Sequence, residues 1–310
     1  MSAGDDSSGD GIDRSGAAGS GGGDPAVVAI GGGHGLAATL RAVRTYTRSV
    51  TAVVSVADDG GSTGRLRAAC DRPAPGDLRK CLIALAGDDS LLARSMEHRF
   101  RNGELEGHAF GNLLIVAMAE TGGDLVASLD EIGRLLGVVG RVLPATTEVV
   151  ELRAEVTSGE QVAGQVAVGG RDDVSTVTVA PLDATACGAA VDAIGAADQI
   201  VLGPGSLYTS VLAATAVSGV RDAIAESTAP LVYVCNLRPQ VHETIGYDVA
   251  AHVDALCRHG LRADVVLYDP STMHGAHGVQ HAVSAPLARS SGLAHDPQLL
   301  GAALVDLLGS

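Results

Sequence analysis

The sequence predicts an α/β fold: a Rossmann-like, doubly wound, mostly parallel sheet with a small β-hairpin insertion. Short runs of Val, Ile, Leu and Ala recur along the chain, as expected for strands covered on both faces. Two of these runs end in glycine turns that open helical patterns, which is typical of strand–turn–helix units. The chain is 46% hydrophobic and contains no Trp. Small and β-branched residues must therefore build the core.

The first unit of this fold spans residues 26–56. Residues 26–30 form a short apolar strand that runs into a glycine turn over residues 31–35. An apolar pattern of helical period follows over residues 36–43, and residues 51–56 predict the second strand. This order is the expected opening of a doubly wound sheet.

Further elements follow from the same patterns. Helices are predicted over residues 78–85, 90–101, 112–120 and 298–308, and strands over residues 199–202, 231–235 and 264–268. Residues 148–156 and 161–168 alternate at period two around a turn at Gly159, which predicts the β-hairpin. We place it in an insertion over about residues 146–180.

We expect one Rossmann-like domain over residues 25–310. Residues 1–24 are rich in Gly, Ser and Asp without hydrophobic periodicity, which predicts a disordered tail. The chain start has neither the basic nor the apolar region of a secretory signal, and no run approaches the ~18 apolar residues of a membrane span. The five cysteines are odd in number and form no CxxC pair, which favours reduced thiols and a cytoplasmic location.

The formal net charge of −15 argues against a general nucleic-acid binder. Positive charge nevertheless gathers at Arg65, Arg67, Arg72, Arg79 and Lys80, and Lys80 is the only lysine of the chain. Such an island is either an anion site or a solvated helix face. Two of these cations fall in the first turn of a predicted helix, where the helix dipole disfavours them unless an anion is near.

The loop after the second strand begins with Asp58 and Asp59 and continues as Gly-Gly-Ser-Thr-Gly. Adjacent carboxylates at the end of a strand serve as Mg²⁺ ligands, as a general base, or as acceptors from sugar hydroxyls. The alternative is an N-cap for the next helix, which uses one carboxylate. Gly61 permits close backbone approach, and Ser62 adds a hydroxyl.

Two glycine turns are candidates for holding a phosphate on free amide groups. One is the turn over residues 31–35, and the other is Gly203-Pro204-Gly205-Ser206, after the strand over residues 199–202. The alternative for each is a tight turn with a purely structural role. We expect the two turns to meet in the crevice where the strand order reverses. Asn112 and Asn236 are candidates for orienting a base or sugar, although Asn112 also suits an N-cap.

No catalytic residue and no metal ligand set is predicted. His274, His277 and His281 lie in a glycine-bearing loop without the periodicity of a metal site. NAD binding is the weaker alternative for such a crevice, because the glycine spacing does not match the dinucleotide fingerprint.

Five blocks together resemble the YvcK-like gluconeogenesis factor family, a relative of the 2-phospho-L-lactate transferases of the CofD superfamily. The resemblance runs from about Val27 to Leu267. The blocks are residues 31–36, 56–67, 75–82, 107–114 and 202–210. The chain departs from the family at Gln240-Val241-His242-Glu243-Thr244, where many relatives carry Gln-Pro-Gly-Glu-Thr, and at Ala294, where relatives tend to carry a basic residue.

The resemblance implies binding of a nucleotide sugar such as UDP-N-acetylglucosamine and a regulatory role that links carbon metabolism to cell-wall synthesis and cell shape. It implies no required cofactor, a homo-oligomer, and regulatory protein partners. The alternative is a Mg²⁺-dependent phospholactyl or phosphoryl transferase. The residues predicted to bind the ligand are Gly31, Gly32, Gly33, His34, Gly35, Asp58, Asp59, Gly61, Ser62, Arg65, Arg79, Asn112, Gly203, Gly205, Ser206, Thr209 and Asn236.

Overall fold

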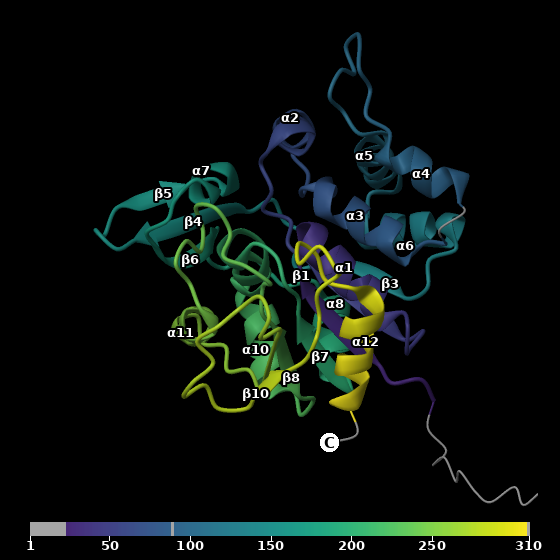
Figure 1. Cartoon of the computed structure of the whole chain (residues 1–310). Helices are drawn as coiled ribbons and strands as arrows, with labels where there is room; N and C mark the ends of the chain where they lie inside the picture. The colour runs from purple at the N-terminus through teal and green to yellow at the C-terminus, as the bar shows by residue number, and fades with distance from the viewer. Residues whose placement is uncertain (1–22, 88–89, 309–310) are drawn as a thin grey trace, which may run out of the picture.

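The computed structural model describes residues 23–87 and 90–308, and its centre is a seven-stranded parallel sheet (Figure 1). The prediction of a disordered tail over residues 1–24 lies, apart from its last two residues, outside this range. The strand order is β10-β9-β8-β7-β1-β2-β3. The strands are β1 (Val27–Gly31), β2 (Val50–Val54), β3 (Arg141–Pro144), β7 (Gln199–Leu202), β8 (Leu231–Val234), β9 (Val265–Tyr268) and β10 (Ala282–Ser284).

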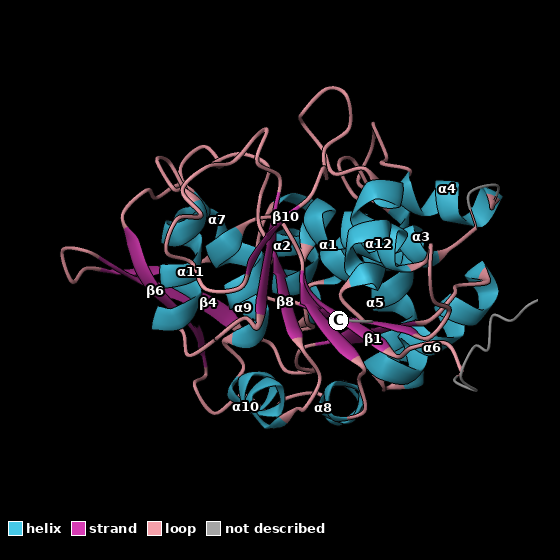
Figure 2. Cartoon of the chain, turned by 60° about the horizontal axis from the view of Figure 1, so that its bottom comes forward, coloured by secondary structure: helices cyan, strands magenta, loops and turns pink. Residues whose placement is uncertain are grey.

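Helices cover both faces of the sheet, so that every residue of β1, β7 and β8 is buried. Figure 2 shows α8 (Gly188–Gly195) and α10 (Ser218–Glu226) on one face, and α1 (Gly33–Val43), α3 (Pro75–Leu85) and α12 (Pro297–Asp306) on the other. Apart from α7 (Gln165–Gly169) in the insertion, the other helices of the described residues are α2 (Gly61–Cys70), α4 (Leu91–Glu97), α5 (Phe110–Gly122), α6 (Leu125–Leu136), η1 (Leu207–Leu212, a π-helix), α9 (Ala213–Thr215) and α11 (Val249–Arg258). The predicted α/β class and mostly parallel sheet are confirmed.

The strand order reverses between β1 and β7, which are neighbours in the sheet. From β1 the chain proceeds outward through β2 and β3, and from β7 it proceeds in the opposite direction through β8, β9 and β10. In a sheet of this kind the connections after the two central strands separate and leave a crevice at their carboxyl ends. Both predicted glycine turns follow these two strands.

The insertion is a three-stranded antiparallel sheet, with β4 (Glu151–Val156) between β5 (Gln161–Ala163) and β6 (Val174–Ala180). The hairpin of β4 and β5 is present. The predicted strand over residues 161–168 is wrong beyond Ala163, because helix α7 (Gln165–Gly169) begins there. Gly164, at φ +95°, makes this change of direction without a side-chain penalty.

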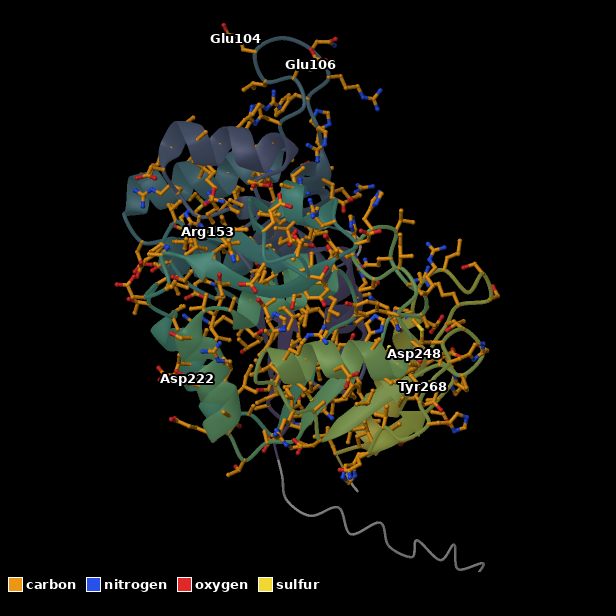
Figure 3. The ribbon with its side chains drawn as sticks, turned by 90° about the vertical axis from the view of Figure 1, so that its left-hand side faces the viewer. Glu104, Glu106, Arg153, Asp222, Asp248 and Tyr268 are labelled. Carbon is orange, nitrogen blue, oxygen red and sulfur yellow. The ribbon has the colours of Figure 1, made fainter. Side chains whose placement is uncertain are left out.

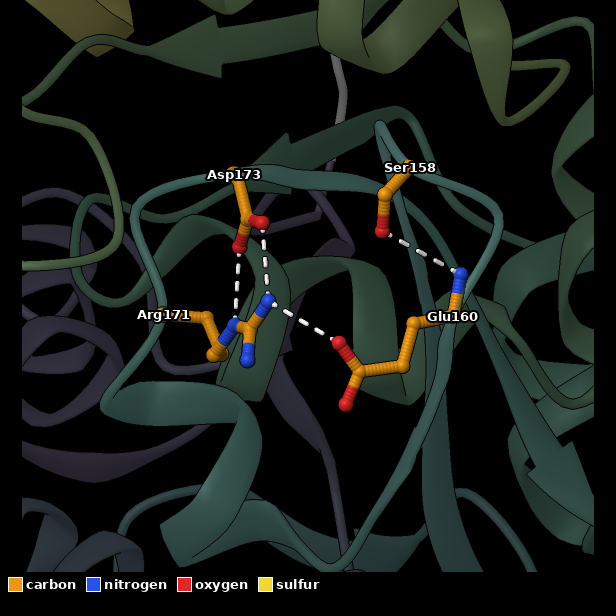
Figure 4. A network of polar contacts seen from close by, with 4 residues as sticks. All are labelled: Ser158, Glu160, Arg171 and Asp173. Carbon is orange, nitrogen blue, oxygen red and sulfur yellow. Dashed lines mark hydrogen bonds and ion pairs between the residues drawn. The ribbon is translucent and has the colours of Figure 1, made fainter.

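An ion-pair network fixes the loop between α7 and β6 (Figure 4). Arg171 donates through Nε and Nη2 to the two carboxylate oxygens of Asp173, both at 2.8 Å. The same Nη2 also donates to Glu160 at 3.4 Å. These contacts connect the β5 end of the hairpin to the start of β6.

One other prediction of secondary structure is wrong, and two strands of the sheet were missed. The helix expected over residues 90–101 ends at Glu97, and residues 98–109 form a protruding loop closed by a bridge between Arg99 and Ala109. Strands β3 and β10 were not predicted, because they are only four and three residues long, too short to show a clear hydrophobic pattern. Among the described residues, every helix is too short or too polar to span a bilayer.

Candidate functional site

The two glycine turns contact each other directly. A Cβ built on Gly35 would lie 1.8 Å from the carbonyl oxygen of Pro204, and one built on Gly205 would lie 3.4 Å from the Gly35 Cα. Only a residue without a side chain allows this approach. The prediction that the turns after β1 and β7 meet is confirmed, and binding of a ligand there stays a prediction.

Two adjoining cavities lie over this contact. The larger has a volume of about 570 Å³ and extends toward the loop after β8 and toward residues 293–295. The smaller, about 240 Å³, extends toward α3 and the Asp58 loop. Four residues line both cavities, namely His34, Gly35, Gly205 and Gln240. The two spaces therefore form one cleft that the glycine turns divide.

Helix α1 presents its first turn to this cleft. Gly32 is its N-cap and has no side chain, and the first intrahelical bond runs from the Leu36 amide to the Gly32 carbonyl. The amides of Gly33, His34 and Gly35 precede that bond, so they are donors of the kind that bind anions at helix N-termini. Burial, with the charge of Lys80 next, lowers the pKa of His34, which favours the neutral ring.

The smaller cavity contains two carboxylates and one ammonium group. Lys80 Nζ donates to Asp77 Oδ1 at 2.9 Å, and Asp77 Oδ2 lies against Gly32. Asp58 accepts from the Gly60 amide at 2.9 Å. Burial raises the pKa of the Asp58 carboxyl, and the charge of Asp77 acts in the same direction. Asp58 is thus the predicted carboxylate that faces the cleft.

Asp59 has a different position. Its two carboxylate oxygens accept from the backbone amides of Gln165 and Val166, each at 2.9 Å. The side chain therefore caps α7 and connects the insertion to the loop after β2. The expectation that Asp59 accepts from a ligand is not supported by this geometry, because neither oxygen is free of a backbone partner.

The second glycine turn has fewer free amides than predicted. Asn236 accepts from the Gly205 amide at 2.7 Å and donates to the Gly205 carbonyl at 2.9 Å, and the Gly203 amide bonds Ile30. Asn236 thus holds the turn rather than reaching out to a base. Ser206 is the residue of this turn with a polar side chain, and it lines the smaller cavity.

A carboxylate of the chain occupies the N-terminal end of η1. Glu243 accepts from the Tyr208 amide at 3.0 Å and from the Thr209 amide at 3.5 Å, and the Thr209 hydroxyl donates to it. Thr209 and these amides are therefore not available to a ligand phosphate in this arrangement. Burial raises the pKa of Glu243, opposed by these bonds.

The larger cavity is lined by both polar and apolar groups. His295 lies at its rim, is 8% exposed, and has no hydrogen-bond partner for Nε2 among the described residues. Burial lowers the pKa of His295 to about 4, so its ring is neutral at pH 7. Leu237, Val241 and Leu293 add apolar surface, and two of them, Val241 and Leu293, are strongly exposed.

Nine of the predicted ligand residues line neither cavity: Gly31, Asp59, Gly61, Ser62, Arg65, Arg79, Asn112, Gly203 and Thr209. Ser62, Arg65, Arg79 and Asn112 gather at the N-terminus of α5, and none of them lines either cavity. Gly61, at φ +49°, opens α2 and faces solvent. Arg65 and Arg79, the two arginines predicted to bind the ligand, line neither cavity, whereas Lys80 lines the smaller one.

The sequence interpretation missed several cleft residues: Asp77, Lys80, Gln165, Ser210, Gln240 and His295. Lys80 had a detectable signal, since it is the only lysine of the sequence. Its predicted position in a first helical turn is wrong, because α3 begins at Pro75 and Lys80 lies in the second turn. No such signal marks Glu243, whose partners are more than 30 residues away. Among the residues described here, no group of three or more His, Cys, Asp or Glu is arranged to hold a metal ion, and this includes the three histidines of the 274–281 loop.

Residues 27–296 match the sequence model of the family described as 2-phospho-L-lactate transferase CofD. The chain belongs to this family. A family relative from Halalkalibacterium halodurans, named gluconeogenesis factor, is 42% identical over 252 residues, which are 80% of this chain and 77% of the relative. A relative from Nostoc sp. is 45% identical over 250 residues, which are 78% of this chain but only 54% of the relative.

The fold of the family is also seen in a crystal structure. A protein of the UPF0052 family from Bacillus halodurans superposes with a TM-score of 0.86 at 36% identity, covering 92% of this chain and all of that one. The chain is thus similar to CofD-family proteins over nearly its whole described length, including the cleft.

Proposed function

We propose that this CofD-family chain binds a nucleotide sugar of the UDP-N-acetylglucosamine type and acts as a regulator in the manner of a gluconeogenesis factor. The observation that carries the proposal is the contact of Gly35 with Pro204 at the point where the strand order reverses, with a cavity on each side. The cavity volumes fall within or near the ~300–1,000 Å³ of small-molecule sites.

The proposal gives each part of the ligand a place in the divided cleft. The diphosphate would lie across the shared wall, against the amides of Gly33, His34 and Gly35, with Lys80 compensating its charge. The sugar would enter the smaller cavity, where Asp58 accepts from its hydroxyls. The nucleoside would occupy the larger cavity, beside His295.

The proposed cellular role links carbon metabolism to cell-wall synthesis and cell shape in the cytoplasm. Its support is the gluconeogenesis factor name of relatives at 42% identity and the family resemblance of the five sequence blocks. The role also implies a homo-oligomer and protein partners that receive the signal. Because the chain spans only part of some relatives, this role is proposed for the described domain alone.

Calorimetric titration with UDP-N-acetylglucosamine and UDP-glucose tests the binding proposal. We expect saturable heat from at least one ligand, and a Lys80→Gln variant should weaken it by about tenfold or more, since it loses a charge-assisted contact. An Arg262→Gln variant removes a similar charge from an exposed site outside the cleft and should bind normally. If millimolar ligand produces no binding heat and no thermal shift, the proposal is wrong.

A second candidate is a Mg²⁺-dependent transfer of a phospholactyl or phosphoryl group. It is favoured by Asp58 and Asp77, which share the smaller cavity, because Mg²⁺ in phosphate sites commonly takes one or two carboxylates and completes its shell with water and phosphate oxygens. Incubation with a deazaflavin acceptor and an activated phospholactate donor tests it. Product that forms with the wild-type protein but not with Asp58→Asn would support a transferase. If the wild-type protein forms no product, the nucleotide-sugar-binding role is favoured.

A further inference from the structure

A cluster of basic side chains surrounds the N-terminus of α5, away from the nucleotide-sugar cleft. Arg65 Nη2 donates to the Glu106 carbonyl at 2.8 Å, and Arg99 Nη1 donates to the Gly107 carbonyl at 2.6 Å. Both guanidinium groups thus bind neighbouring backbone carbonyls of the protruding 98–109 loop, which also carries the side chains of Glu104 and Glu106 (Figure 3). In a chain of net charge −15, this local excess of positive charge is unusual.

Arg79, in helix α3, is the third arginine of the cluster. It extends from α3 so closely along the first turn of α5 that a Cβ on Gly111 would lie 2.8 Å from its Cγ and Cδ. Arg79 is only 7% exposed, and its Nε has no hydrogen-bond partner among the described residues. Burial, followed by the charge of Arg99, lowers the pKa of Arg79, while Glu97, Asp77 and Asp58 act in the opposite direction.

A largely buried guanidinium whose Nε lacks a hydrogen-bond partner among the described residues is costly in this place for two reasons. It gives up hydration without gaining a full set of acceptors. It also lies beside the positive end of the α5 dipole, which repels a cation and attracts an anion. Both costs disappear if a bound anion lies between Arg79 and the helix N-terminus.

The polar groups around this point suit a phosphate. Ser62 Oγ lies 3.2 Å from His108 Nδ1 and accepts from Asn112 Nδ2 at 3.2 Å and from the Ala109 amide at 3.4 Å. Asn112 Oδ1 is buried and has no partner in the described part of the chain. The site thus offers cationic donors together with one unpaired acceptor, which matches a partly protonated phosphate and not a fully ionised sulfate.

We propose that Arg79, Arg99, Arg65 and His108 form a second anion site, which binds the phosphate group of a phosphate monoester separate from the nucleotide sugar. Helix α3 divides the two sites, because Asp77 and Lys80 face the cleft while Arg79 faces α5. The second ligand therefore binds about one helix width from the first and acts as an effector or a second substrate. This site does not depend on the function proposed for the cleft.

Titration with inorganic phosphate, at low salt and without nucleotide sugar, tests the proposal. We expect wild-type protein to bind phosphate and to show a phosphate-dependent shift of the His108 ring resonances in NMR spectra. Arg99→Gln and Arg79→Met should each weaken this binding by about tenfold or more. The control Arg262→Gln, which removes an exposed arginine elsewhere, should leave it within about twofold.

Two further measurements separate the possible outcomes. Lys80→Gln should impair nucleotide-sugar binding but retain the phosphate response of His108, so that failure of one site is not mistaken for failure of the other. Arg65→Gln, at an exposed position, gives a folded variant of the cluster if Arg79→Met does not fold. Absence of phosphate binding at millimolar concentration, or equal binding by wild type, Arg99→Gln and Arg65→Gln, would overturn the proposal.

Discussion

The α-carbon of Gly35 packs against the carbonyl oxygen of Pro204, so that a Cβ at position 35 would lie 1.8 Å from that oxygen. This contact joins segments about 170 residues apart in the sequence and closes the floor of the cleft. A buried strand of the central sheet precedes each residue, Gly35 lies in the first turn of α1, and η1 follows Pro204, so the backbone has little room to yield.

Gly35→Ala should therefore separate the two turns. We expect a loss of about 3 kcal/mol or more in the free energy of unfolding, since the clash is with backbone. Gly195→Ala is the matched control, because an added Cβ meets nothing within 4 Å there, and it should be neutral or stabilise by up to about 1 kcal/mol. Denaturant titration of both variants checks this, and equal stability would show that the contact can relax.

The adjacent carboxylates Asp58 and Asp59 should respond differently to the same substitution. Asp59→Asn weakens the cap of α7, so hydrogen exchange of the Gln165 and Val166 amides should accelerate while nucleotide-sugar affinity changes little. Asp58→Asn should leave that exchange unchanged and reduce the affinity. A reversed pattern would mean that Asp59, not Asp58, faces the ligand.

Glu243 should contribute strongly to the stability of the segment after β8. Its removal in Glu243→Ala leaves the Tyr208 amide and the Thr209 hydroxyl unpaired in a buried place, for a loss of about 3 kcal/mol. Glu226→Ala, at an exposed helix position, should cost less than about 0.5 kcal/mol. Thermal unfolding of the two variants provides the comparison. If both lose the same amount, Glu243 does not stabilise η1.

His295 should make stability depend on pH. Burial lowers its folded-state pKa to about 4 from an ordinary 6.5, so the unfolded chain binds more protons between these values. Stability from this group is complete above pH 6.5 and is lost as pH falls toward 4, by up to about 1.4 kcal/mol per pH unit. His295→Gln should reduce the slope of the unfolding free energy by this amount over the same range. An unchanged slope would show that His295 protonates freely in the folded protein.

The sequence was sufficient for the features that depend on local pattern. Buried strands ending in glycine turns identified β1 and β7, and the place where they meet followed from the reversal of strand order. Asp58 followed from its position after β2. Each of these features lies within a few residues of the pattern that reveals it.

Contacts between distant segments were not predictable in the same way. A carboxylate looks the same in sequence whether it lines a cavity, as Asp58 does, or caps a helix about 106 residues later, as Asp59 does. Glu243 and Asn236 likewise have partners more than 30 residues away. They accept hydrogen bonds from backbone amides of the second glycine turn and of η1, which the sequence pattern had predicted to be free for a ligand. Arg79 was predicted to bind the ligand because positive charge gathers around it in the sequence, but its neighbour Lys80 lines the cleft and Arg79 packs against α5, since adjacent helical residues point in different directions.

A crystal structure of the chain with UDP-N-acetylglucosamine tests the central claim most directly. We predict that the diphosphate lies on the amides of Gly33, His34 and Gly35, with the sugar beside Asp58 and the nucleoside toward His295. A well-ordered ligand bound elsewhere, with both cavities of the cleft empty, would contradict the claim.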